Sequence, residues 1–138
     1  VQIRALHLLS FLVLLCYTTL SVSGQPEQSF LNKHVIKNVD EDMCDAEIRK
    51  RKIYMGKKCK EMNTFIQATA DEINAICAGV KDGPKKSTTM FNIVDCKEKP
   101  KKQENWPECV YNGNEYSVYI EIQCENDKAV HYIRGLGN

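Results

Sequence analysis

The chain has 138 residues, of which 43% are hydrophobic and 27% charged, and its formal net charge is +1 at pH 7. That length suits one compact domain with a sizeable core. The near-neutral charge excludes a globally basic nucleic-acid-binding protein and an acidic-tail protein, although local patches survive such an average.

The first 24 residues have the pattern of a secretory signal peptide. Arg4 precedes an apolar run over residues 8–15, and small residues close the segment at 21–24. This run is too short for a spanning helix with such flanks, which leaves a membrane anchor as the weaker alternative. We therefore expect cleavage near Gly24, secretion to the extracellular space, and a single domain over residues 25–138.

Removal of this segment changes the number of cysteines and the charge balance. Cys16 leaves with it, and six cysteines in a small exported domain indicate three disulfides. None of the six is spaced as C-x-x-C, which argues against a zinc site or redox motif, and we expect no metal and no cofactor. Without Arg4 the 18 remaining basic residues balance the 18 acidic ones. The six cysteines are Cys44, Cys59, Cys77, Cys96, Cys109 and Cys124.

Three helices are predicted in the first half of the mature domain. Apolar residues at roughly helical spacing predict the first over residues 27–36. The second covers 42–51, where acids in the first turn and bases in the last complement the helix dipole. An apolar pattern without Gly or Pro predicts the third over 66–77, and Gly79 is its stop signal.

Strand patterns follow in the second half. Residues 88–96 are rich in β-forming residues, 116–124 alternate with period two, and 128–134 read as a closing strand. Asn112 and Gly113 predict a hairpin turn between residues 109–111 and the alternating run. Helices first and antiparallel strands later predict an α+β domain.

Charge is segregated along the chain. Residues 49–60 contain seven basic residues and no acid, and a second basic stretch lies within 97–102. Such basic runs usually form solvent-exposed faces of a protein. The alternative interpretation is a positively charged surface that binds a polyanion.

His34 and His131 are the two histidines of the mature chain, because His7 leaves with the signal segment. Two groups that titrate near neutral pH can supply a general base and a general acid, whereas the plainer interpretation is a pair of structural or surface histidines. Around them, residues 30–35, the C-K-x-x-N-T-F motif at 59–65 and residues 130–132 resemble the pancreatic ribonuclease superfamily. The resemblance covers the mature chain and fits the three-disulfide, angiogenin-like branch.

This resemblance implies a bent antiparallel β-sheet with three helices and the disulfides Cys44–Cys96, Cys59–Cys109 and Cys77–Cys124. It implies an endoribonuclease that cleaves single-stranded RNA after pyrimidines, through a 2′,3′-cyclic phosphate that is then hydrolysed. The catalytic residues would be His34 as base, His131 as acid and Lys60 as the cation on the phosphoryl oxygens. The substrate-binding residues would be Lys33, Asn63, Thr64, Asp95 and Tyr132.

Three departures from the family are visible. Lys33 stands where the family often has a glutamine that touches phosphate, and a cation there is compatible with phosphate binding. Ile133 stands where the family usually has an aspartate that is hydrogen-bonded to the second histidine, so we expect retained but reduced activity. The short segment between Cys77 and Cys96 removes much of the usual site for the second base, so preference on the 3′ side should be weak.

Partners and location follow from the same resemblance. A basic cluster aligns with the one that angiogenins use for nuclear and nucleolar entry, and the same residues could steer phosphate; it comprises Arg49, Lys50, Arg51 and Lys52. Besides RNA, the expected partners are a ribonuclease inhibitor, a cell-surface receptor or anionic surfaces, and we expect a monomer. The alternative function is an angiogenic or antimicrobial binding protein with vestigial ribonuclease activity.

Overall fold

The computed structural model describes residues 25–100 and 105–137, so the expected signal segment lies outside the described residues. The described helices are α2 (Gln25–His34), the 3-10 helix η1 (Glu41–Met43), α3 (Cys44–Lys50) and α4 (Ala70–Ile76). The strands are β1 (Val35–Ile36), β2 (Tyr54–Met55), β3 (Lys58–Cys59), β4 (Met62–Gln67), β5 (Asp82–Lys86), β6 (Phe91–Glu98), β7 (Tyr111–Glu125) and β8 (Lys128–Leu136). This arrangement confirms the expected α+β class. Across these residues no helix is both long and apolar enough to cross a membrane.

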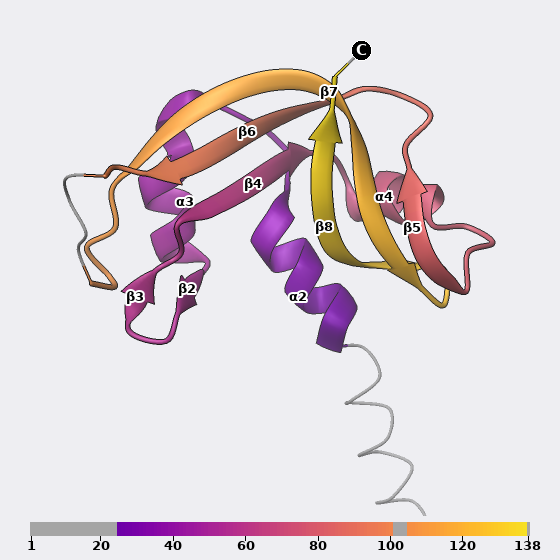
Figure 1. The fold of residues 1–138 in the computed structure, drawn as a ribbon, viewed down its shortest axis with the longest axis horizontal. Helices are drawn as coiled ribbons and strands as arrows, with labels where there is room; N and C mark the ends of the chain where they lie inside the picture. The colour runs from indigo at the N-terminus through magenta and orange to yellow at the C-terminus, as the bar shows by residue number, and fades with distance from the viewer. Residues whose placement is uncertain (1–24, 101–104, 138) are drawn as a thin grey trace, which may run out of the picture.

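The long strand β7 joins the two arms of a strongly curved sheet. Its residues 111–118 pair with β6, and its later residues pair with β5 on one side and β8 on the other. Strands β4 and β6 pair antiparallel, whereas the short β1 is parallel to β4. In Figure 1, β6 and β7 arch over the molecule and α2 lies in the hollow between β4 and β8. The curvature therefore brings the end of α2 close to two strands that are distant in sequence.

Each arm of the sheet has its own hydrophobic cluster. The cluster under α2, α4 and β8 includes Phe30, Ile73 and Ile122, all buried. The other cluster lies around α3, β4 and β6 and includes Ile48 and Phe65. Helix α2 therefore packs over the first cluster, while its carboxyl end reaches toward β4, whose residues Ile66 and Phe65 belong to the first and second cluster respectively.

The three disulfides have the pairing that the resemblance implies: Cys44–Cys96, Cys59–Cys109 and Cys77–Cys124. They tie α3 to β6, the β2–β3 hairpin to the segment before β7, and the end of α4 to β7. Sequence separations of 47 to 52 residues make each closed loop long. In the chain-entropy account each bond then destabilises the unfolded state by about 4 kcal/mol.

The predicted third helix, 66–77, is wrong at its start. Ile66 belongs to β4, where residues 63–66 are buried and pair with β6. The helix begins after Thr69, whose side chain accepts from the Glu72 backbone while the Glu72 side chain accepts from the Thr69 N–H. This capping box fixes the helix start at Ala70, four residues later than apolar periodicity suggests. The first two helices also differ at their ends, since residues 35–36 form β1 and residues 41–43 form η1.

The predicted hairpin at Asn112 and Gly113 is also wrong. Both residues lie inside β7, opposite Lys97 and Cys96 of β6. The turn between β7 and β8 lies at residues 126–127, which both have positive φ. Gly113 serves a different need, because a Cβ there would collide with the Glu41 carbonyl oxygen and lie 3.1 Å from Cys44 Sγ. A glycine is required where η1 and α3 cross the strand.

We predict that Gly113→Ala lowers the free energy of unfolding by about 1–3 kcal/mol, because the added methyl group must displace backbone rather than a flexible side chain. Urea denaturation of the variant measures this change. Gly137→Ala is the matched control, since no atom lies within 4 Å of a Cβ at that position. Equal stability of the two variants would contradict the close approach.

Candidate active site

A cleft of about 410 Å³ opens between α2, the start of β4 and β8. It brings together side chains from three distant parts of the sequence, each at the end or edge of its element. Most of the predicted site residues line it, whereas Asp95 lies behind Thr64 and the basic cluster of 49–52 lies elsewhere. The lining residues that the sequence predicted are Lys33, His34, Lys60, Asn63, Thr64, His131 and Tyr132, and Ile133 joins them.

His34 is the last residue of α2, and its ring is buried against the sheet. Its Nδ1 lies 2.8 Å from the carbonyl oxygen of Thr64 on β4. Because a carbonyl oxygen only accepts, Nδ1 carries the proton in this bond and Nε2 has a free lone pair. The ring stands between Phe30, one helical turn earlier, and Tyr132 of β8, at centroid distances of 5.2 and 5.6 Å.

The neutral form of His34 is favoured by its surroundings. Burial lowers the pKa of His34 from 6.5 to about 4, and the hydrogen bond to the Thr64 carbonyl opposes this only in part. The charged groups that face it, Lys60, Lys33 and His131, lower the pKa further. At neutral pH the imidazole is therefore an unprotonated acceptor.

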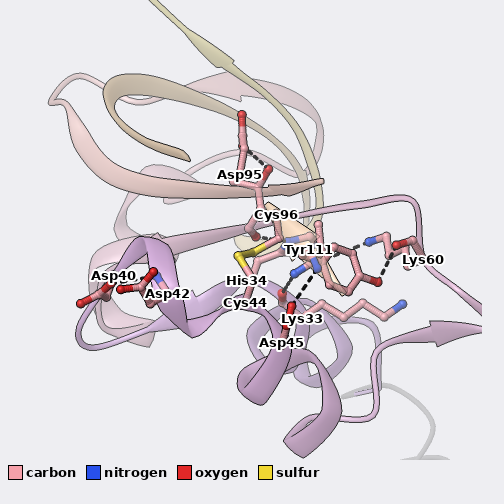
Figure 2. The surroundings of a disulfide bond; sticks show 12 residues. Lys33, His34, Asp40, Asp42, Cys44, Asp45, Lys60, Asp95, Cys96 and Tyr111 are labelled. Carbon is pink, nitrogen blue, oxygen red and sulfur yellow. Dashed lines mark hydrogen bonds between the residues drawn. A yellow bond between two sulfur atoms is a disulfide. The ribbon is translucent and has the colours of Figure 1, made fainter. Parts of the chain in front are cut away.

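Lys60 is held at the cleft by a chain of contacts that starts at α3. Asp45 accepts the backbone N–H of Tyr111 at 2.8 Å, and the Tyr111 hydroxyl donates to the Lys60 carbonyl at 2.6 Å. Figure 2 shows this chain beside the Cys44–Cys96 disulfide. Burial, with Lys33 as a second cause, lowers the pKa of Lys60. The backbone of Lys60 is thus fixed while its ammonium group faces the cleft.

Asn63 connects the ammonium group to the helix. Lys60 Nζ donates to Asn63 Oδ1 at 3.0 Å, and Asn63 Nδ2 donates to the Lys33 carbonyl at 2.8 Å. The side chain is buried and both ends of its amide are used within the protein. Asn63, which the resemblance placed among the substrate-binding residues, therefore positions Lys60 relative to the end of α2.

Thr64 and Asp95 form a second polar pair at the floor of the cleft. They lie opposite each other in the β4–β6 register, and Thr64 Oγ1 donates to Asp95 Oδ1 at 2.6 Å. Tyr132 lies beside them, and burial first, then Asp95, raises the pKa of its hydroxyl to about 12. The phenol is therefore neutral, and this corner offers hydroxyl groups rather than charges.

His131 differs from His34 in being exposed on β8, opposite Gln123. In residues 25–100 and 105–137, no side chain is hydrogen-bonded to its imidazole. Ile133, two residues later, is 42% exposed and supplies no polar partner. The C-terminal residues up to Gly137 do not cover the cleft. Strand β8 continues to Leu136, which pairs with Tyr119 of β7.

Sequence reasoning missed two contributors. Tyr111 carries no motif of its own, and only the β6–β7 pairing places its hydroxyl on Lys60. Met62, 42% exposed, adds an apolar wall to the cleft. No grouping of His, Cys, Asp or Glu suited to a metal ion occurs among the described residues.

Comparisons with known proteins relate the whole described domain to one family. A family model described as pancreatic ribonuclease matches residues 25–133. Ribonuclease-like 3 of Danio rerio is 34% identical, over 91% of this chain and 92% of that protein. Angiogenin of Sus scrofa is 31% identical, over 91% and 88%. The X-ray structure of zebrafish RNase5 superposes with a TM-score of 0.71 at 36% identity, over 80% of this chain and 94% of that one.

The low pKa of His34 makes stability depend on pH. Between pH 6.5 and about 4 the unfolded chain binds a proton at His34 that the folded chain does not. We predict that the free energy of unfolding falls as the pH drops through this window, with about 3 kcal/mol contributed by this group.

Urea denaturation at pH 7 and pH 4.5 measures this effect in the wild type and in His34→Asn, which keeps an amide donor for the Thr64 carbonyl. The loss of stability should be smaller in His34→Asn, while His131→Asn, which keeps the buried His34, should retain most of the wild-type loss. An equal loss in all three proteins would rule out His34 as the source.

Proposed function

The chain belongs to the pancreatic ribonuclease family, and from that premise we propose that it is a secreted endoribonuclease that cleaves single-stranded RNA on the 3′ side of pyrimidines. The observation that carries the proposal is the cleft itself, where a buried neutral imidazole, a lysine and an exposed imidazole face one space. RNA supplies its own nucleophile, the 2′-hydroxyl, so these three side chains suffice.

His34 acts as the general base in this proposal. Its Nε2 lone pair accepts the 2′-hydroxyl proton as the oxygen attacks phosphorus, while Nδ1–H stays on the Thr64 carbonyl. The ring cannot turn without breaking that buried bond. A pKa below neutrality keeps the base in its active form over the physiological range.

His131 and Lys60 complete the first step. Protonated His131 gives its proton to the departing 5′-oxygen as the P–O bond breaks, which leaves a 2′,3′-cyclic phosphate. Lys60 donates to the phosphoryl oxygens, where negative charge increases in the transition state. Hydrolysis follows with the roles reversed, because His131 then activates water and His34 returns its proton to the 2′-oxygen. DNA, which lacks the 2′-hydroxyl, would bind without being cut.

Pyrimidine choice is assigned to Thr64. Its hydroxyl and backbone amide suit the edge of a pyrimidine, and Asp95 orients the hydroxyl through the 2.6 Å bond. Lys33 adds a cation for a neighbouring phosphate. The segment between Cys77 and Cys96 is short and largely formed by β5 and the start of β6, which supports weak preference for the base on the 3′ side.

Secretion is supported by three disulfides, which form in oxidising compartments, and by the signal pattern of residues 1–24. Expression of the full chain in a eukaryotic cell, with the amino terminus of the protein in the medium read by mass spectrometry, tests cleavage near Gly24.

We predict that the purified protein cleaves a uridylyl-adenosine dinucleotide and not its 2′-deoxy counterpart. His34→Ala and His131→Ala should each lower kcat/KM by about 10²- to 10⁴-fold, the usual contribution of a general acid or base. Activity should fall on the acid side as His34 gains a proton. Lys37→Ala, an exposed position outside the cleft, should match the wild type.

Equal inactivity of the wild type and both histidine variants would refute the catalytic proposal. It would favour the rival function, an angiogenic or antimicrobial binding protein with vestigial ribonuclease activity.

The unpartnered His131 gives a second prediction. Ile133→Asp places a carboxylate two residues away on the exposed side of β8, where it can orient the imidazole and stabilise its charged form. One added hydrogen bond is worth about 1 kcal/mol, or about fivefold in kcat. Steady-state kinetics measure this gain, with Ile133→Asn as the neutral control of the same size. Unchanged turnover in Ile133→Asp would count against an orientation defect.

A further inference from the structure

Arg51 differs from its neighbours in the basic cluster. Arg49, Lys50 and Lys52 are exposed, whereas the Arg51 side chain is only 20% exposed and turns inward. Its guanidinium carbon lies 5.5 Å from the ring centroid of buried Phe65, a cation–π contact. A guanidinium in this position is not available to a phosphate or to a transport receptor, so the cluster keeps three free cations rather than four.

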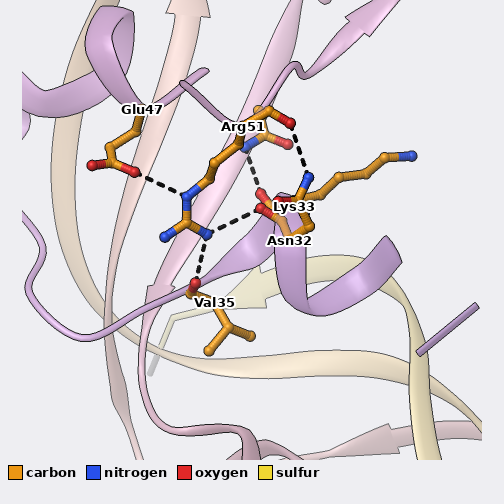
Figure 3. Close-up of polar contacts among 6 residues, drawn as sticks. Asn32, Lys33, Val35, Glu47 and Arg51 are labelled. Atoms are coloured by element: carbon orange, nitrogen blue, oxygen red, sulfur yellow. Dashed lines mark hydrogen bonds and ion pairs between the residues drawn. The ribbon is translucent and has the colours of Figure 1, made fainter. Parts of the chain in front are cut away.

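The bonds of Arg51 converge on the end of α2. Nη1 donates to the carbonyl of Asn32 at 3.0 Å and to that of Val35 at 2.7 Å. The Asn32 side chain donates back to the Arg51 carbonyl at 3.0 Å. Figure 3 shows this set of contacts between α3 and the end of α2. Carbonyls at a helix carboxyl end lack intrahelical partners and carry partial negative charge. A guanidinium donates hydrogen bonds to them and supplies the opposite charge.

Glu47 fixes the direction of the guanidinium. Its Oε2 accepts from Arg51 Nε at 2.9 Å, one turn earlier on α3. The planar fork is thereby held by a carboxylate at one edge and by two backbone carbonyls at another. A lysine at this position has no such fork and cannot make the same set of bonds.

His34 lies between the two residues whose carbonyls Arg51 holds. The Phe65 ring that Arg51 contacts is adjacent to Thr64, whose carbonyl holds the other side of the imidazole. We propose that Arg51 is a positioning residue for His34, which fixes the end of α2 against β4 so that the imidazole stays on the Thr64 carbonyl with Nε2 directed to the cleft. The proposal rests on the proposed function only in giving His34 its role as base.

Arg51→Met tests the proposal, because it keeps the apolar stem and removes every donor. Displacement of a catalytic group by about 1 Å can cost up to about 10²-fold in rate. We expect kcat on the dinucleotide to fall at least about tenfold with KM changed less than about threefold. Arg51→Lys, which keeps the charge, should recover only part of the loss.

The titration of His34 provides a readout that a merely structural arginine would not move. When the end of α2 loosens, the His34 imidazole becomes more exposed to solvent, so the pKa of His34 should rise from about 4 toward 6.5. The groups that face it, Lys33, Lys60 and His131, are unchanged in the variant. The acid limb of the kcat/KM profile and the C2–H resonance of His34 in NMR should both move to higher pH.

Arg134→Met is the matched control. Arg134 also donates through Nε to a glutamate, Glu121, at 3.0 Å, but it is 63% exposed and has no bond to α2. This variant should keep the wild-type kcat and His34 titration.

A wild-type kcat and titration in Arg51→Met, measured below its unfolding transition, would overturn the proposal even if the variant is less stable. If Arg51→Met does not fold, Arg51→Lys and Glu47→Gln decide the question, because both retain most of the packing. If the wild type has no activity, the proposed function fails, while the NMR titration still decides whether Arg51 positions His34.

Discussion

The hydrogen bond from His34 Nδ1 to the Thr64 carbonyl connects a helix end to a strand 30 residues away in the sequence. It is buried, and its acceptor is a backbone carbonyl, so the imidazole cannot turn without breaking it. The bond determines three properties of the site together: the tautomer of the imidazole, the direction of Nε2 and the distance between α2 and β4. The remaining contacts of the cleft keep these two elements in the positions that the bond requires.

Contacts with neighbouring elements hold both partners of this bond in place. On the strand side, Thr64 is fixed by its register with Asp95 on β6, and β6 is tied to α3 through Cys44–Cys96. On the helix side, Asn63 holds the carbonyl of Lys33. Each of these contacts crosses between elements, whereas α2 alone has only ten residues and would be marginal as an isolated helix. The disulfides and the arched sheet are therefore what allow a short helix to hold the His34 side chain at the cleft.

The sequence predicted the fold class, the disulfides and the residues of the cleft because a motif and a cysteine order carry that information. The sequence-based prediction was wrong where contacts with elements distant in the sequence determine what a residue does. Gly113 has the local signature of a turn, yet its lack of a Cβ serves the crossing of η1 over β7. Ile66 fits a helical period, yet pairing with β6 outweighs that period. Arg51 stands in a run of four basic residues, and only the packing of α3 on α2 sets it apart.

The cleft also explains how a chain with a formal net charge of only +1 can attract an anion. Lys33, Lys60 and the two histidines share one small space, and burial with mutual repulsion lowers the pKa of both His34 and Lys60. A phosphodiester there would favour the charged forms and raise both pKa values, and by linkage the cleft would then bind the anion more tightly. A base that started at its ordinary pKa would become protonated at neutral pH by the same effect. Because burial first brings His34 to about 4, the imidazole can lie beside a phosphate and still accept a proton.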